Sequence, residues 1–393
     1  MPWEPLTDDQ LEIRELARTL ARERIAPRAA DIDASHEFPW DVVELFREQG
    51  LFGLFFDEEL GGTGTGTLLS LVVIEEVSKV CATSGLILAV QELGSLALKL
   101  SGSQEQQARY LPKVASGEWL VAYALTEAGS GSDSAAMRTT ARRDGDAYVL
   151  EGSKRFITNA GVASLYTVFA KTDPDAGHAG ISAFVVEADT PGFEVARLEP
   201  KMGIAGSTTG ELVFEECRVP ADNLLGAEGE GFKIAMRVLD RSRPGVAAQG
   251  LGIAQGATDY ALEYARTRET MGKPIAEHQL VAAKLADMET RCEAARGLLY
   301  RFGRMVDESA SDAELTKASA MAKLACTDAA MWVTTEAVQV LGGYGYIREY
   351  PVERMMRDAK ITQIYEGTNE IQRLVIAREM LKESRAFLLA GVT

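Results

Sequence analysis

The spacing of apolar and polar residues divides the chain into three parts. From Thr7 to about residue 117 the apolar positions recur at helical spacing. Thr7 to Gln10 has the form of a capping box, and Pro39 stands at the first turn of a helix that ends at Gly50. Further helices are predicted over 67–80, 84–100 and 104–115, so the first part is expected to be entirely helical.

The pattern changes at Trp119, where short strand-like runs replace helical spacing. Turn signals such as Asp144-Gly145, Asn159 to Gly161 and Pro191-Gly192 separate the runs. No helix long enough for a crossover between parallel strands interrupts them, which argues against a Rossmann unit and for an antiparallel sheet. The predicted strands are 120–126, 139–143, 148–150, 155–158, 166–171, 181–186 and 212–214.

Long helical patterns return after Gly231, over 231–266, 277–308, 312–341 and 368–388. The fold class expected is therefore α+β and multi-domain. It comprises an N-terminal α-helical domain (1–118), a middle antiparallel β-barrel-like domain (119–228) and a C-terminal four-helix-bundle domain (229–393).

Composition narrows the classes of partner. With 41 Lys plus Arg against 58 Asp plus Glu, the net charge of -17 disfavours nucleic acid as a partner. The four cysteines are far apart and the three histidines are scattered, so no metal site is expected and the thiols are predicted to be buried in a reducing cytoplasm. Residues 1–5 show no basic, apolar leader, and no run of about 18 apolar residues suggests a membrane span. The glycine-rich run from Gly61 to Gly66 lacks the spacing of a phosphate loop and is interpreted as a plain loop.

The stretch from Arg357 to Arg373 carries the strongest candidate for chemistry. An apolar run leads Glu366 into Gly367, and Thr368 then opens a further helix, so Glu366 is predicted to lie on a break between two helices. A carboxylate held there beside Ile364 and Tyr365 would be partly desolvated, which raises its pKa and makes it usable as a base.

Six motifs together resemble the acyl-CoA dehydrogenase family. They are Tyr123 to Asp133 (YALTEAGSGSD), Phe156 to Asn159 (FITN), Asp240 to Pro244 (DRSRP), Arg266 to Pro274 (RTRETMGKP), Gln339 to Gly343 (QVLGG) and Tyr365 to Thr368 (YEGT). Their order and approximate spacing match the family over essentially the whole chain.

The resemblance implies FAD as cofactor and a catalytic base at Glu366. Thr126 and Thr158 would bond the isoalloxazine ring, and Arg268 and Gln279 with Gln339 to Gly343 would hold the pyrophosphate and adenine across a subunit interface. The cofactor-binding residues implied are Tyr123, Leu125, Thr126, Gly131, Ser132, Phe156, Ile157, Thr158, Arg268, Gln279, Gln339, Gly342, Gly343, Thr368 and Glu370. The substrate-binding residues implied are Ser132, Asp240, Arg243 and Gly367.

The same resemblance implies the reaction and the partners. The reaction would be dehydrogenation of an acyl-CoA to the trans-2-enoyl-CoA in fatty acid or branched-chain amino acid catabolism, with electrons passed to electron transfer flavoprotein. The expected assembly is a homotetramer built as a dimer of dimers. The alternatives are an acyl-CoA oxidase, a medium-chain dehydrogenase and a nucleic-acid-binding relative, the last disfavoured by the acidic charge. The absence of Arg from the helix 84–98 argues against a dicarboxylic acyl group such as glutaryl, which needs a buried cation for its distal carboxylate. Tyr365 before the base, and Gln91 with Glu92 near the expected pocket end, favour a short or methyl-branched saturated acyl chain.

One position distinguishes two branches of the family. In some members the base stands where this chain has Ser242, and a hydroxyl cannot replace a carboxylate, so Glu366 is preferred.

Three other positions depart from the family's pattern: Ala128 replaces a common Pro, Phe156 a frequent Trp and Met271 a common Phe. Ala128 is expected to make the flavin loop less rigid, and Phe156 to keep the apolar face but lose the indole N–H. Met271 is expected to loosen FAD binding without removing the site.

Overall fold

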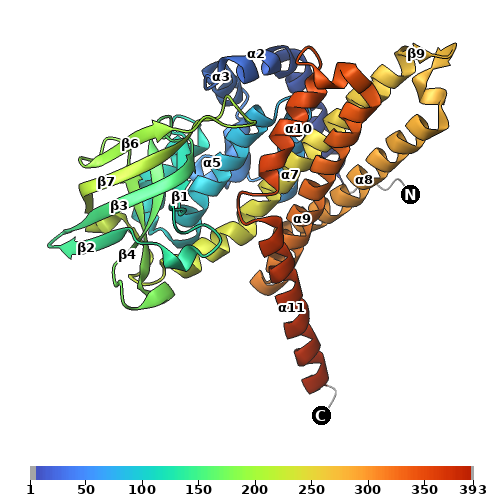
Figure 1. Ribbon diagram of the computed structural model, residues 1–393. Helices are drawn as coiled ribbons and strands as arrows, with labels where there is room; N and C mark the ends of the chain where they lie inside the picture. The colour runs from blue at the N-terminus through green and yellow to red at the C-terminus, as the bar shows by residue number, and fades with distance from the viewer. Residues whose placement is uncertain (1–5, 391–393) are drawn as a thin grey trace.

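The computed structural model describes residues 6–390. Residues 1–5, on which the expectation of no leader rests, lie outside the described part. A helical N-terminal part, a β-sheet and a helical C-terminal part follow one another along the chain, with the sheet at one side of the molecule (Figure 1). Within residues 6–390, no helix combines the length and the apolar character needed to cross a membrane.

The N-terminal helices begin where the sequence predicts them. The Thr7 capping box is confirmed: Thr7 Oγ1 accepts from the Gln10 N–H at 3.3 Å, and Gln10 Oε1 accepts from the Thr7 N–H at 3.0 Å. The α-helices of this part are α1 (Asp8–Leu20), α2 (Ala29–Ser35), α3 (Trp40–Glu48), α4 (Thr67–Ser78), α5 (Ala82–Ser101) and α6 (Gln104–Ala115).

The middle part is a mixed, open sheet, so the expectation of an antiparallel, barrel-like domain is wrong in two respects. β1 pairs with β4 in parallel, with Val121 opposite Leu165, and β2 meets β4 in parallel at Thr140 and Lys171. The sheet order β6-β7-β3-β2-β4-β5-β8 leaves β6 and β8 at its two ends. The strands are β1 (Val121–Ala124), β2 (Thr140–Asp144), β3 (Ala147–Thr158), β4 (Leu165–Lys171), β5 (Ile181–Glu187), β6 (Phe193–Leu198), β7 (Thr209–Pro220) and β8 (Leu224–Leu225).

Strand β3 is continuous, whereas the sequence pattern predicts two strands there. Its pairing with β7 shifts register between Leu150 and Gly152 and again between Lys154 and Ile157. A bulge interrupts the alternation of apolar and polar residues without ending the strand. The second bulge places Phe156 at φ 60 and turns its side chain to the open face, where it is 58% exposed.

The C-terminal part consists of long helices packed on the N-terminal ones. α5 packs against β1 on one side and against α7 on the other, so it lies at the junction of all three parts. The elements are α7 (Gly231–Thr267), the hairpin β9 (Glu269–Thr270) and β10 (Lys273–Pro274), α8 (Gln279–Asp307), α9 (Asp312–Leu341), α10 (Pro351–Thr362) and α11 (Asn369–Ala390). In Figure 1, α11 extends away from the rest of the molecule and exposes Leu374, Met380 and Leu381.

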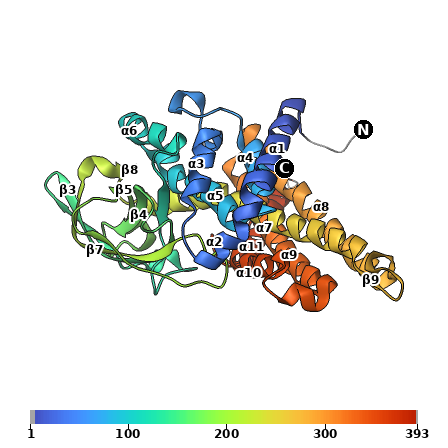
Figure 2. The same cartoon turned by 90° about the horizontal axis from the view of Figure 1, so that it is seen from above.

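Two hydrophobic clusters hold the described part of the chain together. The larger one runs through the N- and C-terminal helices without a break, and the smaller one lies within the sheet. Seen from above in Figure 2, the sheet lies to one side and the helices pack around α5 and α7. Cys81, Cys217, Cys292 and Cys326 are all buried and unpaired, which confirms the prediction that the thiols are buried.

Candidate active site

The break between α10 and α11 holds Glu366 in a strained turn. Glu366 has φ 52 and Gly367 has φ 87, both in the left-handed region that a glutamate rarely adopts. The Gly367 carbonyl accepts from Lys323 Nζ at 2.9 Å and from Gln372 Nε2 at 2.8 Å, and Arg243 Nε lies 3.4 Å from the Glu366 carbonyl. Side chains from α7, α9 and α11 therefore hold the turn in place.

The Glu366 carboxyl group points back toward α7. Its Oε2 accepts from Ser242 Oγ at 2.6 Å. Burial raises the pKa of Glu366, while the Ser242 hydrogen bond and the charges of Arg243 and Lys323 act in the opposite direction. Sequence reasoning considered Ser242 only as a replacement for the base, whereas in the structure Ser242 donates a hydrogen bond to Glu366.

Lys323 is a functional candidate that sequence reasoning missed. Its side chain is fully buried behind the turn, and Nζ also donates to Asn369 Oδ1 at 2.8 Å. Burial lowers the pKa of Lys323 to about 7, although the nearby Glu366 charge raises it. The signal was available in principle, because Lys323 is the one cation in the otherwise apolar run from Ala318 to Ala325 of α9.

The predicted substrate residues Asp240 and Arg243 lie next to Glu366. Arg243 is 4% exposed and its Nη1 donates to Asp240 Oδ1 at 2.6 Å. The other oxygen of Asp240 accepts from Thr316 Oγ1 at 2.6 Å. The pair is thus fixed on the same stretch of α7 that carries Ser242.

The two loops predicted to face the flavin lie side by side on the sheet. The Arg155 N–H donates to the Thr126 carbonyl at 2.8 Å, which joins the loop after β1 to β3. Buried Lys154 donates to Glu127 Oε1 at 2.7 Å and to the Leu125 carbonyl at 3.3 Å. Ile157 is buried, whereas Gly131 and Ser132 are exposed.

These loops leave hydrogen-bonding groups without a partner. Within residues 6–390, the half-buried hydroxyls of Thr126 and Thr158 bond no other residue, and the Tyr123 hydroxyl is buried without a partner. Burial raises the pKa of Tyr123 well above its usual value, and the Glu366 charge raises it further. Unsatisfied buried polar atoms are rare in proteins, so these groups fit a flat, hydrogen-bonding ligand at this surface.

A second group of predicted cofactor residues lies away from the sheet, where α7 and α9 end. Arg268, Gly342 and Gly343 line a cavity of about 470 Å³, and the Arg268 guanidinium lies 5.5 Å from the centre of the Tyr344 ring. Gln279 and Gln339 are exposed near these segments, and Thr368 and Glu370 open α11 at the catalytic turn. The β9–β10 hairpin that follows Arg268 projects at the opposite end of the molecule from the sheet in both Figure 1 and Figure 2.

Gln91 does not face the expected pocket end. Its Nε2 donates to the carbonyls of Val114 and Trp119, both at 2.8 Å, and the side chain is fully buried. The expectation that placed Gln91 with Glu92 at the pocket end is therefore wrong for Gln91. Successive residues of a helix point in different directions, so two neighbours in sequence rarely share one wall.

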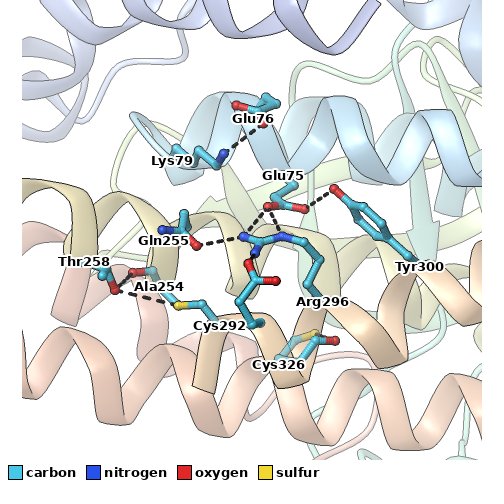
Figure 3. Close-up of polar contacts among 12 residues, drawn as sticks. Glu75, Glu76, Lys79, Ala254, Gln255, Thr258, Cys292, Arg296, Tyr300 and Cys326 are labelled. Atoms are coloured by element: carbon cyan, nitrogen blue, oxygen red, sulfur yellow. Dashed lines mark hydrogen bonds and ion pairs between the residues drawn. The ribbon is translucent and has the colours of Figure 1, made fainter. Parts of the chain in front are cut away.

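A further large hollow is separate from these residues. Its volume is about 1610 Å³, and none of the predicted site residues lines it. Its floor carries a buried polar network in which Glu75 of α4 accepts from Arg296 and Tyr300 of α8 (Figure 3). Gln255 of α7 accepts from Arg296 as well, so the network ties three helices together.

Comparison with known proteins finds similarity along almost the whole chain. Three family models match: the N-terminal domain of acyl-CoA dehydrogenase over residues 7–118, the middle domain over 122–217 and the C-terminal domain over 229–381. Cyclohexane-1-carbonyl-CoA dehydrogenase of Geobacter metallireducens is 50% identical over 374 residues, which cover 95% of this chain and 97% of that protein.

Two solved structures share the fold. A chain in the structure of the electron transferring flavoprotein of Acidaminococcus fermentans gives a TM-score of 0.94 at 45% identity, covering 97% of this chain and 100% of that one. Butyryl-CoA dehydrogenase from Megasphaera elsdenii gives a TM-score of 0.93 at 43% identity, with the same coverage. The chain therefore belongs to the acyl-CoA dehydrogenase family, whose members are FAD-dependent oxidoreductases acting on CH–CH groups.

Proposed function

We propose that this protein oxidises a short or methyl-branched saturated acyl-CoA to the trans-2-enoyl-CoA with FAD as its cofactor, and that Glu366 is the base. The observation that carries the proposal is the turn at Glu366: a desolvated carboxylate with a raised pKa, fixed by Ser242 on one side and by Lys323 on the other. The substrate class draws support from relatives named for cyclohexane-1-carbonyl-CoA, which is branched at the α-carbon, and for butyryl-CoA.

The side chain and the backbone of the turn act on different atoms of the substrate during proton removal. Glu366 takes the proton from the α-carbon of the thioester. The backbone N–H groups of Glu366 and Gly367 bond no other residue within 6–390, so they are free to donate to the thioester oxygen. A donor placed on that oxygen stabilises the enolate charge by about 3 kcal/mol. FAD, once held there, would supply the two-electron acceptor for the hydride that leaves the β-carbon.

The residues that would hold FAD are those with free hydrogen-bonding capacity on the sheet. Thr126 and Thr158 offer hydroxyls to the ring, and exposed Phe156 offers an aromatic face. Arg268 with the glycine N–H groups of Gly342 and Gly343 would hold the pyrophosphate. Because these two groups lie at opposite ends of one chain, a complete site requires a second copy, which supports the proposed homotetramer.

The electron acceptor proposed is electron transfer flavoprotein. Support comes from the similar chain described above, which is found in the structure of the electron transferring flavoprotein of Acidaminococcus fermentans. Reoxidation of the reduced protein by oxygen alone, at a rate that matches turnover, would instead favour an oxidase.

Purified protein should be yellow, and anaerobic butyryl-CoA, isobutyryl-CoA or cyclohexane-1-carbonyl-CoA should bleach its flavin absorbance, because the hydride reduces the ring. The measurement is absorbance near the flavin maximum after mixing with each acyl-CoA. Octanoyl-CoA serves as the comparison for chain length. Protein that carries FAD but is bleached by none of these compounds would contradict the proposed function.

Arg268→Ala should lower the FAD content of the purified protein by about tenfold or more, because it removes the guanidinium proposed to hold the pyrophosphate. FAD per chain is measured after denaturation, and oligomeric state by light scattering. Arg266→Ala is the matched control, because Arg266 is an exposed cation on the same helix end. Equal FAD content in both variants would remove Arg268 from the cofactor site.

A further inference from the structure

Glu92 is an unusual residue for its surroundings on α5. Every other residue from Ala82 to Leu98 is buried, and Glu92 is the one residue of this stretch that is only partly buried, with its carboxyl group shielded from water. An ionisable side chain in such a helix must face either a partner or an opening. The direction of its carboxyl group shows which of these it faces.

The carboxyl group of Glu92 faces α7 beside the catalytic turn. A methyl group placed on Gly245 would lie 3.7 Å from Glu92 Oε2, an ordinary contact distance, so the carboxyl group lies against this position of α7. Ser242, three residues earlier and therefore on the same face of α7, donates to Glu366. Glu92 and Glu366 thus lie along one face of α7, about one helical turn apart.

In the described part of the chain Glu92 has no directly bonded partner, although the Lys99 charge lies close enough to act on it. Among residues 6–390, its carboxylate makes no hydrogen bond and no ion pair. The charged groups around it are Lys99 on its own helix, Glu366 at the turn, and Asp57 and Arg241, which share with Glu92 and Lys99 the lining of a cavity of about 170 Å³. Lys99 directs its Nζ to the Phe55 carbonyl instead of to Glu92.

Burial is the main reason that the pKa of Glu92 is raised to about 7, and the Glu366 charge adds to it while Lys99 opposes it. The Glu366 charge therefore disfavours ionisation of Glu92, which loses its proton near neutral pH. An acyl chain that is held at Glu366 and runs along α7 from Ser242 toward Gly245 would therefore approach the Glu92 carboxyl group.

We propose that Glu92 is a specificity-determining residue that makes the acyl site accept uncharged acyl groups and reject those that end in a carboxylate. The proposal rests on the proposed function, because it assigns Glu92 to the acyl end of that same site. A distal carboxylate would leave water and approach two like charges, the carboxylates of Glu366 and Glu92. Within residues 6–390, neither of these carboxylates is hydrogen-bonded to a cation. Repulsion between like charges is strong where water is excluded.

The test measures inhibition by glutaryl-CoA of the flavin bleaching caused by pentanoyl-CoA, which has the same chain length but ends in a methyl group. In Glu92→Gln, the inhibition constant of glutaryl-CoA should fall about tenfold or more at pH 8, because one repulsive charge is gone. Glu92→Asp retains the charge and should keep the rejection. Glu59→Gln, an exposed glutamate of the neighbouring loop, should behave as the unmodified protein.

The pH dependence gives a second readout that a purely structural role would not change. In the unmodified protein the inhibition constant of glutaryl-CoA should rise between pH 6 and pH 8, as Glu92 loses its proton, and this rise should be absent in Glu92→Gln. The same inhibition constant and the same pH profile in both proteins would overturn the proposal. Absence of bleaching by pentanoyl-CoA and by every other uncharged acyl-CoA in the unmodified protein would instead contradict the proposed function.

Discussion

Glu366→Gln is expected to retain FAD and to lose flavin bleaching by acyl-CoA, with the rate constant falling by about 10²–10⁴-fold. Gln has nearly the shape of Glu and its amide oxygen can still accept from Ser242 Oγ, so the turn should keep its conformation. The variant lacks only the carboxylate that is proposed to accept the α-proton. The measurement is stopped-flow absorbance of the flavin under anaerobic conditions, together with FAD content.

Ser242→Ala is the matched variant, since it keeps the base and removes the hydrogen bond that favours the ionised form. The pKa of Glu366 should rise further in this variant. The bleaching rate should therefore fall by about tenfold at low pH, where the carboxylate becomes protonated, and change little at high pH. Full bleaching by Glu366→Gln would move the base to another residue, whereas an unchanged pH profile in Ser242→Ala would remove the serine from its proposed role.

The elements that the sequence predicts well are those set by local interactions. The capping box at Thr7 and the helix break at Glu366 depend on residues within one or two turns, and both are present in the structure. The direction and order of the strands depend on partners far along the chain. The pattern of short strands therefore could not show that β1 lies parallel to β4, or that the sheet is open.

The residues of the candidate site likewise fall into two groups, those that sequence motifs predict and those that only helix packing brings to the site. Motifs placed Glu366, Asp240 and Arg243 in one set, and the structure brings these three residues together through contacts between α7 and the turn. Lys323 and Glu92 belong to no motif, and each reaches the turn or its surroundings only through helix packing. Packing geometry also decides that Gln91 turns away while its neighbour Glu92 does not.

The buried network of Glu75, Arg296 and Tyr300, at the floor of the hollow of about 1610 Å³, should contribute strongly to the free energy of unfolding. Arg296→Met is expected to destabilise the protein by about 3–5 kcal/mol, because it leaves the Glu75 carboxylate buried with Tyr300 as its remaining donor. Glu75 is 1% exposed, so its carboxylate depends on these hydrogen bonds for stabilisation in the folded protein. With about 2.1 cal/mol/K of unfolding entropy per residue over 393 residues, this loss corresponds to a fall in melting temperature of roughly 4–6 °C, measured by calorimetry on the FAD-loaded protein.

The exposed pair of Arg218 and Asp144 provides the control, because it has a similar separation, 2.7 Å against 2.9 Å, but side chains that are 53% and 48% exposed. Arg218→Met should cost about 1 kcal/mol or less, since water screens the pair. The double variant Glu75→Leu with Arg296→Met removes both charges and should recover part of the loss, because no buried charge is then left without its partner. If Arg296→Met is no more destabilising than Arg218→Met, the network does not tie α4, α7 and α8 together in the way that its hydrogen bonds indicate.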